Sequence, residues 1–363
     1  MHSNITWAII GGGNGGQSLA GHLAMMGFPV RLYDIFPDTI NAIETLGGIH
    51  VDGVVKGFGP LEKVTTQIAE AVRGATIVMV VAPAVAHRSI AKDCAPHLED
   101  GQIVFIHPGS TGGALEFKKV FEDEGCTATV TLAESNSLLY ACRCSEPGHA
   151  SIFGVKKELT VGTLPAVDIQ IVMEKLNPAF PQMKPGKNIL ETSLANPNAI
   201  MHPAPTLLNT SMIESKREWL YYWDGITPSI GAFIESLDLE RVALGRVFGL
   251  NLPPIRTWYK LAYGVSGSSL SEAVKLNTAY AGVSGQTSLH TRYLLEDIPM
   301  GLVPMISLGK MLDVDVVRME TIVNLAQFIL EKDLTTVGRT VETLGLAGKS
   351  ASDIVSFVET GLC

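Results

Sequence analysis

The stretch WAIIGGGNGGQSLAGHLAMMG, residues 7–27, decides the fold of the first part of this chain. It starts as an apolar run, passes through closely spaced glycines and ends with helical periodicity. Gly11, Gly13 and Gly16 stand in GxGxxG register at that junction, which predicts the strand, turn and helix of a dinucleotide-binding βαβ unit. Gly11 is expected to permit the tight turn, Gly13 to let the backbone approach a pyrophosphate, and Gly16 to let helix and strand pack closely.

The next apolar run ends at Asp34, which indicates the cofactor. A carboxylate about 20 residues beyond the glycines accepts hydrogen bonds from both ribose hydroxyls of NAD and repels the 2′-phosphate of NADP. Residues 34–38, DIFPD, hold no Arg or Lys, so we predict NAD. Asn14 and Pro83 are expected beside the cofactor. The alternative is a purely structural glycine turn with a helix-capping Asp.

Through the first half, short apolar runs alternate with helical patterns, which predicts a doubly wound parallel sheet in an α/β domain. We expect a peripheral hairpin over Gly47–Val64, antiparallel strands over Cys142–Thr163 that close the sheet, and a helix over Val167–Leu176. The strands predicted for the sheet are Ile5–Ile10, Val30–Asp34, Ala75–Ala82, Gln102–Ile106 and Val130–Ala133.

A proline- and glycine-marked connector, residues 177–188, separates this half from a region of long helical periodicities. We therefore expect a dinucleotide-binding domain over residues 1–186 and a mainly α-helical domain over residues 187–363. The helices predicted in the second domain are Leu194–Ile213, Pro228–Phe248, Ile255–Tyr263, Val303–Leu312 and Val316–Leu330.

Composition narrows the function classes. A length of 363 residues favours two hydrophobic cores. The net charge of −9 disfavours nucleic acid and anionic membrane surfaces as partners. The five cysteines show no CxxC pair and no zinc-ligand spacing, so we expect reduced thiols, no metal site and a cytoplasmic location. The first apolar run breaks into glycines far short of a membrane span.

One catalytic candidate is His202, in LANPNAIMHPAPTLLN, residues 194–209. It follows Asn198 by four positions, which puts both on one face of a helix within an apolar stretch. Histidine is the side chain whose ordinary pKa suits proton transfer near neutrality. A buried structural histidine with a capping Asn explains the same spacing equally well.

The second candidate segment is SLHTRYLLEDIPMGLVP, residues 288–304. Arg292 could bind a carboxylate with two parallel hydrogen bonds, and Asp297 could orient a histidine ring. Solvated charges on a helix are the alternative for this segment alone. A further substrate contact, Thr111, is expected in the turn Ser110–Gly113, for which a plain helix cap is the alternative.

Taken together, the motifs resemble those of the opine dehydrogenase family, which includes octopine dehydrogenase and N-(1-D-carboxyethyl)-L-norvaline dehydrogenase. The likeness extends over almost the whole chain. It implies a Rossmann domain, a helical domain similar to the C-terminal domain of 6-phosphogluconate dehydrogenase, and substrate held in a cleft between them. The segments that carry it are GGGNGG, VVAPAVAH, HPGSTGGALEF, NPNAIMHPAPTLLN, YYWDGITPSIG and TRYLLEDIPMGLVP.

This resemblance implies NADH-dependent reductive condensation of an α-keto acid, pyruvate by default, with an L-amino acid, and the reverse oxidation. The family's His–Arg–Asp set carries over to His202, Arg292 and Asp297. His202 would be the general acid/base, Asp297 would orient it, and Arg292 would hold the keto-acid carboxylate. Asn198 and Thr111 are expected as further substrate contacts.

Aromatic residues of the second half are candidate walls for the amino-acid side chain: Trp223, Trp258 and Tyr259. Core packing is the alternative for each. A homodimer formed through the helical domains is also expected. The sequence does not select the amino acid.

Two other function classes stay open. A ketopantoate reductase-like enzyme or 2-hydroxy-acid dehydrogenase shares the glycine loop, but such enzymes typically place a lysine on the helix that carries His202 here, and residues 194–203 contain none. A non-catalytic NAD sensor has no need for His202, Arg292 and Asp297 together. NADH oxidation that requires both a keto acid and an amino acid would favour the opine reading.

Overall fold

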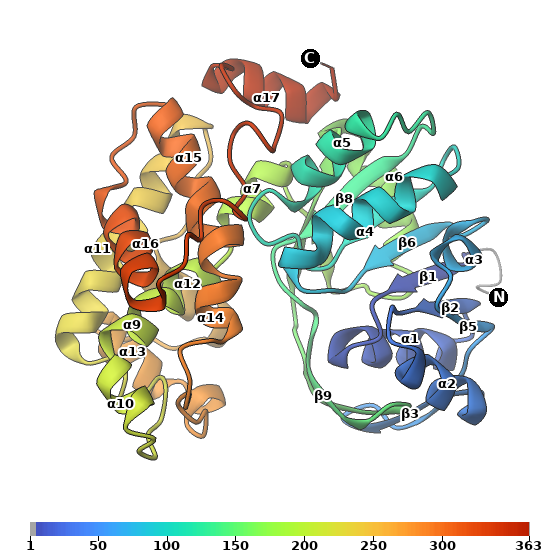
Figure 1. Cartoon of the computed structure of the whole chain (residues 1–363), viewed down its shortest axis with the longest axis horizontal. Coiled ribbons are helices and arrows are strands. Elements are labelled where there is room, and N and C mark those ends of the chain that lie inside the picture. The colour runs from blue at the N-terminus through green and yellow to red at the C-terminus, as the bar shows by residue number, and fades with distance from the viewer. Residues whose placement is uncertain (1–4, 363) are drawn as a thin grey trace. The chain divides into compact units, whose positions relative to one another are not determined.

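The computed structural model describes residues 5–362 and divides the chain into two compact units (Figure 1). The first unit contains the described residues up to Ser193 and those from Val355 onward, and the second unit contains Leu194–Ile354. The division expected from the sequence, after residue 186, lies shortly before this one. The described residues from Val355 onward, which include most of helix α17 (Ala351–Thr360), also belong to the first unit, whereas the prediction placed them in the second domain.

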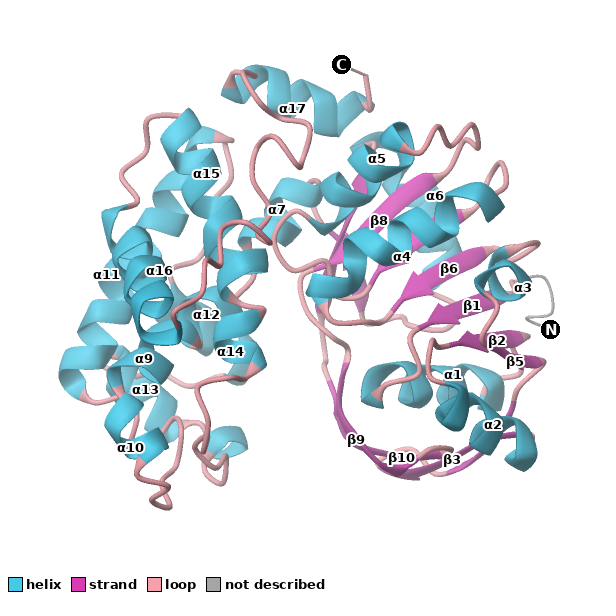
Figure 2. Ribbon diagram, in the orientation of Figure 1, coloured by secondary structure: helices cyan, strands magenta, loops and turns pink. Residues whose placement is uncertain are grey.

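An eight-stranded sheet forms the centre of the first unit, with the order β12-β11-β8-β7-β6-β1-β2-β5. Figure 2 labels β8, β6, β1, β2 and β5 of this sheet. Neighbours from β5 to β8 are parallel, whereas β11 is antiparallel to β8. All five predicted strands are present, with ends that differ by a few residues. The strands are β1 Trp7–Ile10, β2 Val30–Tyr33, β5 Lys63–Thr65, β6 Ile77–Val80, β7 Ile103–Ile106, β8 Thr131–Ser135, β11 Leu159–Leu164 and β12 Met183–Pro185.

A second sheet contains four strands in the order β4-β3-β10-β9. It corrects the predictions for Gly47–Val64 and Cys142–Thr163. The predicted hairpin exists as β3 (Gly48–Gly53) and β4 (Gly57–Pro60), but β3 also pairs in parallel with β10 (His149–Val155). β10 in turn pairs with β9 (Tyr140–Glu146). Of the region expected to close the main sheet, only β11 does so. Local alternation indicates strands but does not indicate which sheet they join.

Helix α1 (Asn14–Met25) lies between the two sheets (Figure 2). Its contact with the second sheet depends on glycine. A Cβ on Gly21 would lie 2.7 Å from Cγ2 of Val51, and a Cβ on Gly59 would lie 2.2 Å from the carbonyl oxygen of Gly21. The predicted hairpin is therefore not peripheral, because it covers the helix that follows the glycine loop.

The other helices of the first unit have recognisable ends. In α2, Pro37 stands in the first turn and Gly47, at φ 72°, ends the helix, as the fixed φ of proline and the freedom of glycine favour. The helix predicted over Val167–Leu176 is confirmed as α6. The elements are α2 Pro37–Leu46, α3 Ile68–Val72, α4 His87–Cys94, α5 Gly113–Asp123, α6 Ile169–Leu176 and α7 Ile189–Leu194, with short 3₁₀ turns at Ala84–Ala86, Ala95–His97 and Ala166–Asp168.

The second unit is mainly helical, which confirms its predicted class. Four of the five predicted helices are present as α11, α12, α15 and α16. The predicted long helix Leu194–Ile213 is wrong, because this segment forms separate short helices over Asn198–Met201, Pro203–Leu208 and Thr210–Glu214. Pro203 stands at the break between the first two, since proline lacks the N–H that would continue the helix. The elements are α8 Asn198–Met201, α9 Pro203–Leu208, α10 Thr210–Glu214, α11 Pro228–Val247, α12 Ile255–Tyr263, α13 Leu270–Leu276, α14 Arg292–Leu295, α15 Val303–Met311 and α16 Val317–Leu330, with the 3₁₀ turn η4 Thr278–Tyr280 and the π-helical turn η5 Ile298–Leu302.

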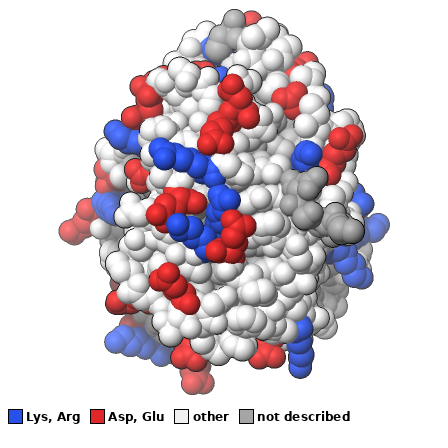
Figure 3. Space-filling view, turned by 90° about the vertical axis from the view of Figure 1, so that its right-hand side faces the viewer, with Lys and Arg blue, Asp and Glu red and all other residues white. Residues whose placement is uncertain are grey.

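Two further features concern the length of the helices and the charges on the surface. Among residues 5–362, no helix combines the length and the apolar character that crossing a membrane requires. On the face drawn in Figure 3, the described Lys and Arg side chains are interspersed with Asp and Glu.

Candidate active site

The glycine loop connects β1 to α1, and its three glycines differ in their surroundings. Gly11 has φ 115°, and a Cβ there would lie 2.4 Å from the carbonyl oxygen of Val81. A Cβ on Gly16 would lie only 1.7 Å from the carbonyl oxygen of Gly11. Around Gly13, by contrast, a Cβ would meet no described atom within 4 Å. The loop is therefore crowded where helix and strand pack and open where a pyrophosphate is expected.

Asp34 lies beside this loop, directly after β2. Its carboxylate accepts hydrogen bonds from the backbone N–H of Gly12 and, at 3.0 Å, from that of Phe36. An acidic group at the end of the second strand, next to an open glycine loop, fits the ribose of a dinucleotide. Pro83, the other residue expected near the cofactor, is exposed just after β6.

The second sheet holds the first turn of α1. Oδ1 of Asn14 accepts a 2.8 Å hydrogen bond from the backbone N–H of Cys144. Gln17 donates to the carbonyl oxygen of Gly12 at 2.6 Å and accepts from the backbone N–H of Gly148 at 2.8 Å. Sequence reasoning missed Gln17, because its partners are far away in the chain. Asn14, which is expected beside the cofactor, thus also bonds to the second sheet through Oδ1.

The turn before α5 does not present Thr111 as a substrate contact. Its side chain is buried, and its hydroxyl donates to the carbonyl oxygen of Ser193 at 3.2 Å. The oxygen atoms of the fully buried Glu134 accept bonds of 2.7, 2.7 and 2.8 Å from Thr192, Ser193 and the N–H of Ala114. No side chain of the turn itself caps α5, because the Thr111 hydroxyl is bonded to Ser193 and the N–H of Ala114 is bonded to Glu134.

His107, at the end of β7, is a fully buried histidine with both nitrogens bonded. Nε2 accepts from the backbone N–H of Leu139 at 3.1 Å, so Nδ1 carries the proton and donates to Oγ of Ser135 at 2.6 Å. Burial lowers the pKa of His107 to about 3, and the charge of Lys156 is a smaller cause. This ring is a neutral structural element.

The second unit brings His202 and Asp297 together. Nδ1 of His202 lies 2.7 Å from Oδ2 of Asp297. Both residues are buried, with relative exposures of 7% and 4%. A carboxylate can only accept a hydrogen bond, so the Nδ1 proton belongs to the histidine and Nε2 is the nitrogen left for proton exchange.

Three tyrosines surround His202, and sequence reasoning assigned a role to none of them. The ring of Tyr293 stacks on the imidazole, with 3.8 Å between centroids and 8° between planes. The hydroxyl of Tyr221 donates to the carbonyl oxygen of His202 at 2.7 Å. The hydroxyl of Tyr222 lies 3.4 Å from Nε2. The motif segments YYWDGITPSIG and TRYLLEDIPMGLVP contain all three, which was the available signal.

Arg292 and Asn198 lie on the elements that carry the histidine pair. The side chain of Arg292, on α14, is 58% exposed, and its Nε lies 3.4 Å from Oε2 of Glu296. The carbonyl oxygen of Asn198, on α8, accepts the backbone N–H of His202 at 3.0 Å, so the two residues share one helical turn as predicted. Within residues 5–362, no hydrogen bond or ion pair joins Arg292 to His202.

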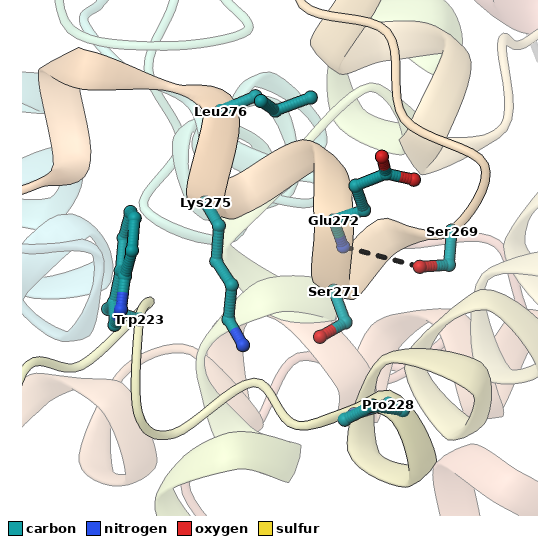
Figure 4. A pocket seen from close by; sticks show the side chains of 7 residues that line it. All are labelled: Trp223, Pro228, Ser269, Ser271, Glu272, Lys275 and Leu276. Carbon is teal, nitrogen blue, oxygen red and sulfur yellow. Dashed lines mark hydrogen bonds between the residues drawn. The ribbon is translucent and has the colours of Figure 1, made fainter.

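The predicted aromatic walls divide into two groups. Tyr259 is fully buried and packs edge-on against Trp258 and Tyr280, which favours core packing. Trp223 is 45% exposed and lies with Pro228, Lys275 and Leu276 around a surface hollow of about 330 Å³ (Figure 4). Neither His202 nor Asp297 lines that hollow. Across the described chain, no group of three or more His, Cys, Asp or Glu side chains could hold a metal ion.

The comparisons with known proteins agree with the division into a first unit with a glycine loop and a mainly helical second unit. A family model for the α-helical domain of NAD/NADP octopine/nopaline dehydrogenases matches residues 185–330, and one for the N-terminus of NAD-dependent glycerol-3-phosphate dehydrogenase matches residues 6–109. Opine dehydrogenase of Arthrobacter sp. (strain 1C) is 39% identical over 360 residues, which cover 99% of this chain and 100% of that protein. The chain belongs to the opine dehydrogenase family. It is an NAD(P)-dependent oxidoreductase that acts on CH–NH donors.

Solved structures share the fold of this opine dehydrogenase. Octopine dehydrogenase with NADH and L-arginine has a TM-score of 0.81 and 22% identity, over 97% of this chain and 98% of that one. The same enzyme with NADH and pyruvate has a TM-score of 0.80 and 22% identity, over 99% and 98%. Yersinopine dehydrogenase with NADP⁺ bound has a TM-score of 0.74 and 15% identity, over 99% and 98%.

Family membership decides between the alternatives that the sequence left open. The glycine loop resembles that of other dehydrogenases, as the match of the first unit to a glycerol-3-phosphate dehydrogenase model illustrates. The helical region and the full-length relative select an opine dehydrogenase over a ketopantoate reductase-like enzyme or a non-catalytic sensor.

Proposed function

We propose that this opine dehydrogenase joins an α-keto acid, with pyruvate as the first choice, to the amino group of an L-amino acid and reduces the resulting imine with NADH. The product is an N-(1-carboxyalkyl)-amino acid, and the reverse reaction oxidises it. The observation that carries this proposal is the buried 2.7 Å pair of His202 and Asp297. The octopine dehydrogenase structures with L-arginine and with pyruvate support the two substrate classes.

His202 is the general acid/base in this proposal. The imidazolium gives a proton from Nε2 to the hydroxyl group of the carbinolamine, the C–O bond breaks, and water leaves as the iminium C=N bond forms. The bound cofactor supplies the hydride that reduces the iminium to a secondary amine. Asp297 keeps the Nδ1 proton in place and stabilises the positive charge on the ring while Nε2 holds its proton.

Arg292 is proposed to bind the carboxylate of the keto acid. Its guanidinium has five N–H donors in a rigid plane, and only Nε points to Glu296 in the contact described above. The exposed remainder can bind a carboxylate with two hydrogen bonds. Asn198, one helical turn before His202, is proposed as a further polar contact for substrate.

NADH is the proposed cofactor rather than NADPH. The fold itself accepts either, since the related structures contain NADH and NADP⁺. The basis of the choice is Asp34, whose carboxylate lies beside the glycine loop and would repel a 2′-phosphate. Gly11, Gly13 and Gly16 are the proposed pyrophosphate loop.

The test measures NADH oxidation with pyruvate alone, with amino acids alone, and with both together, and identifies the product by mass spectrometry. We expect oxidation only when both substrates are present, with one secondary-amine dicarboxylate formed per NADH. Reduction of pyruvate to lactate without an amino acid would refute the proposal. His202→Gln should remove turnover while NADH still binds, and near-normal turnover of that variant would refute the role of His202. The homodimer stays a prediction, to be checked by light scattering.

A further inference from the structure

We infer that Tyr222 is a positioning residue for His202, whose hydroxyl pairs with Nε2 in the free enzyme and shares that nitrogen with the substrate during the reaction. This inference rests on the proposed function, because it assigns a role at the same histidine. It also assigns a chemical role to a residue of the motif segment YYWDGITPSIG, which contains Tyr222.

Three contacts restrain the imidazole of His202 from different directions. Asp297 holds Nδ1 at 2.7 Å, Tyr293 covers one ring face at a centroid distance of 3.8 Å, and the Tyr222 hydroxyl lies 3.4 Å from Nε2. The first two contacts fix the tautomer and the plane of the ring. Among residues 5–362, the hydroxyl of Tyr222 is the hydrogen-bond partner of Nε2, the nitrogen that exchanges protons.

The two nitrogen contacts differ in strength. A distance of 2.7 Å is typical of a charge-assisted bond, whereas 3.4 Å lies beyond the usual range for a hydroxyl and an imidazole nitrogen. The Asp297 bond is therefore the stronger of the two. The Tyr222 bond can lengthen or shorten as a substrate atom arrives, as catalytic hydrogen bonds in free enzymes commonly do.

The Tyr222 ring is itself held in place. It stacks on Tyr280 with 4.1 Å between centroids and 11° between planes. Tyr222 is 93% buried, since its relative exposure is 7%. Burial raises the pKa of Tyr222 well above its ordinary value, so the group stays a neutral hydroxyl.

A neutral hydroxyl suits a nitrogen that gains and loses a proton, because it both donates and accepts. It donates to Nε2 of the neutral imidazole and accepts from Nε2–H of the imidazolium. Neither protonation state of His202 then leaves a buried nitrogen without a partner, a state that costs free energy. A phenylalanine at this position would keep the stack on Tyr280 and lose both functions.

The experiment therefore compares Tyr222→Phe with Tyr263→Phe. Each removes one hydroxyl from the same aromatic cluster, but Tyr263 is an exposed surface residue whose hydroxyl bonds to Tyr280. We expect Tyr222→Phe to lower kcat about tenfold, the equivalent of one hydrogen bond, while KM for pyruvate and Kd for NADH change less than about threefold. Tyr263→Phe should keep wild-type kinetics.

A spectroscopic measurement separates positioning from general structural damage. In ¹⁵N-histidine-labelled protein, with His202 identified by its absence from His202→Gln, the wild-type Nε2 resonance should have the shift of a hydrogen-bonded nitrogen. Tyr222→Phe should move it toward the shift of an unbonded nitrogen, while the Nδ1 proton resonance, set by Asp297, stays in place. Tyr263→Phe should move neither.

Unchanged kcat and an unchanged Nε2 resonance in Tyr222→Phe would overturn the inference. An unbonded Nε2 shift in the wild-type enzyme would overturn it without any variant. The proposed function fails separately, through the His202→Gln variant: if that protein keeps normal turnover, the acid/base assignment itself is wrong. If it is inactive while Tyr222→Phe behaves as wild type, only the role of Tyr222 is refuted.

Discussion

Nδ1 of His202 and Oδ2 of Asp297 lie 2.7 Å apart, although 95 positions separate the two residues in the sequence. Neither side chain is more than 8% exposed. Low solvent access strengthens the bond and keeps the proton on Nδ1. The chemistry proposed for Nε2 therefore depends on a carboxylate that need not itself touch the reacting atoms.

Asp297→Asn tests that dependence. An amide can donate to Nδ1, which shifts the ring proton to Nε2 and produces the wrong tautomer for a general base. We expect kcat to fall by about two to four orders of magnitude in the oxidative direction. Steady-state kinetics give this value, and quenching of protein fluorescence by NADH serves as the control for cofactor binding. A kcat within threefold of wild type would show that the pair has no catalytic part.

The glycine loop offers two alanine substitutions with opposite expected outcomes. Gly16→Ala puts a methyl group 1.7 Å from the Gly11 carbonyl oxygen, so the backbone must move, and we expect a loss of roughly 2 kcal/mol or more in the free energy of unfolding. Gly13→Ala meets no atom within 4 Å and has an ordinary φ of −74°, so stability should stay near wild type.

Cofactor affinity should separate the same two variants. In Gly13→Ala the methyl group would occupy the space expected for the pyrophosphate, so NADH binding should weaken about tenfold or more in a fully folded protein. Urea unfolding and calorimetric titration with NADH provide the two measurements. Normal NADH affinity in Gly13→Ala would place the pyrophosphate elsewhere.

Asp34→Asn tests the choice between NADH and NADPH. Removing the negative charge weakens the ribose contact and removes the repulsion of a 2′-phosphate. We expect the ratio of kcat/KM for NADH to that for NADPH to fall about tenfold or more. Asp38→Asn, an equal charge change at an exposed position in the first turn of α2, is the matched control. Equal ratios in both variants would contradict the role of Asp34.

His107 predicts a pH dependence of stability. Its pKa is about 3 in the folded protein against an ordinary 6.5, so the unfolded chain binds a proton that the folded protein rejects. The stability that depends on a neutral His107 is fully present above pH 6.5, and it is lost as the pH falls from 6.5 toward 3. His107→Gln should therefore lose stability less steeply on acidification through this window, as urea unfolding would measure. The exposed His290→Gln should follow the wild-type slope, and an unchanged slope in His107→Gln would contradict the prediction.

Glu134→Ala tests the buried carboxylate of the first unit. The substitution removes the acceptor of three donors, the hydroxyls of Thr192 and Ser193 and the N–H of Ala114. We expect a loss of about 3 kcal/mol or more in the free energy of unfolding. Glu122→Ala, which removes an exposed carboxylate paired only with Lys118 across one helical turn, should cost less than about 1 kcal/mol. Equal losses would mean that the buried network adds no stability.

The main sheet could be predicted because its information is local. Strands buried on both faces are continuous apolar runs, as Trp7–Ile10 and Ile103–Ile106 illustrate. The second sheet could not be predicted in the same way. Its central contact pairs His50 with His149 in parallel, and neither local pattern names the other as a partner. The helix at Leu194–Ile213 failed for a different reason, because periodicity was given more weight than its prolines.

The residues of the candidate site could be predicted from the sequence, but the contacts between their side chains could not. Spacing alone left His202 and Asp297 with structural alternatives, and the family resemblance selected them. Their bond, the stacked Tyr293 and the hydroxyl of Tyr222 arise from tertiary packing between α8, α14 and the segment after α10. The burial of Thr111 and its bond to Ser193 could not be predicted either, because a turn sequence does not reveal whether its hydroxyl is already bonded.

The contacts of Asn14 and Gln17 with the second sheet have a consequence for how the protein is made. Their partners, Cys144 and Gly148, follow them by 130 and 131 positions. A ribosome therefore releases the glycine loop long before it has synthesised the strands that hold the first turn of α1. Contacts of such long sequence separation form late and slowly. The glycine loop therefore exists before the residues that restrain it, and a βαβ fragment on its own would lack these restraints.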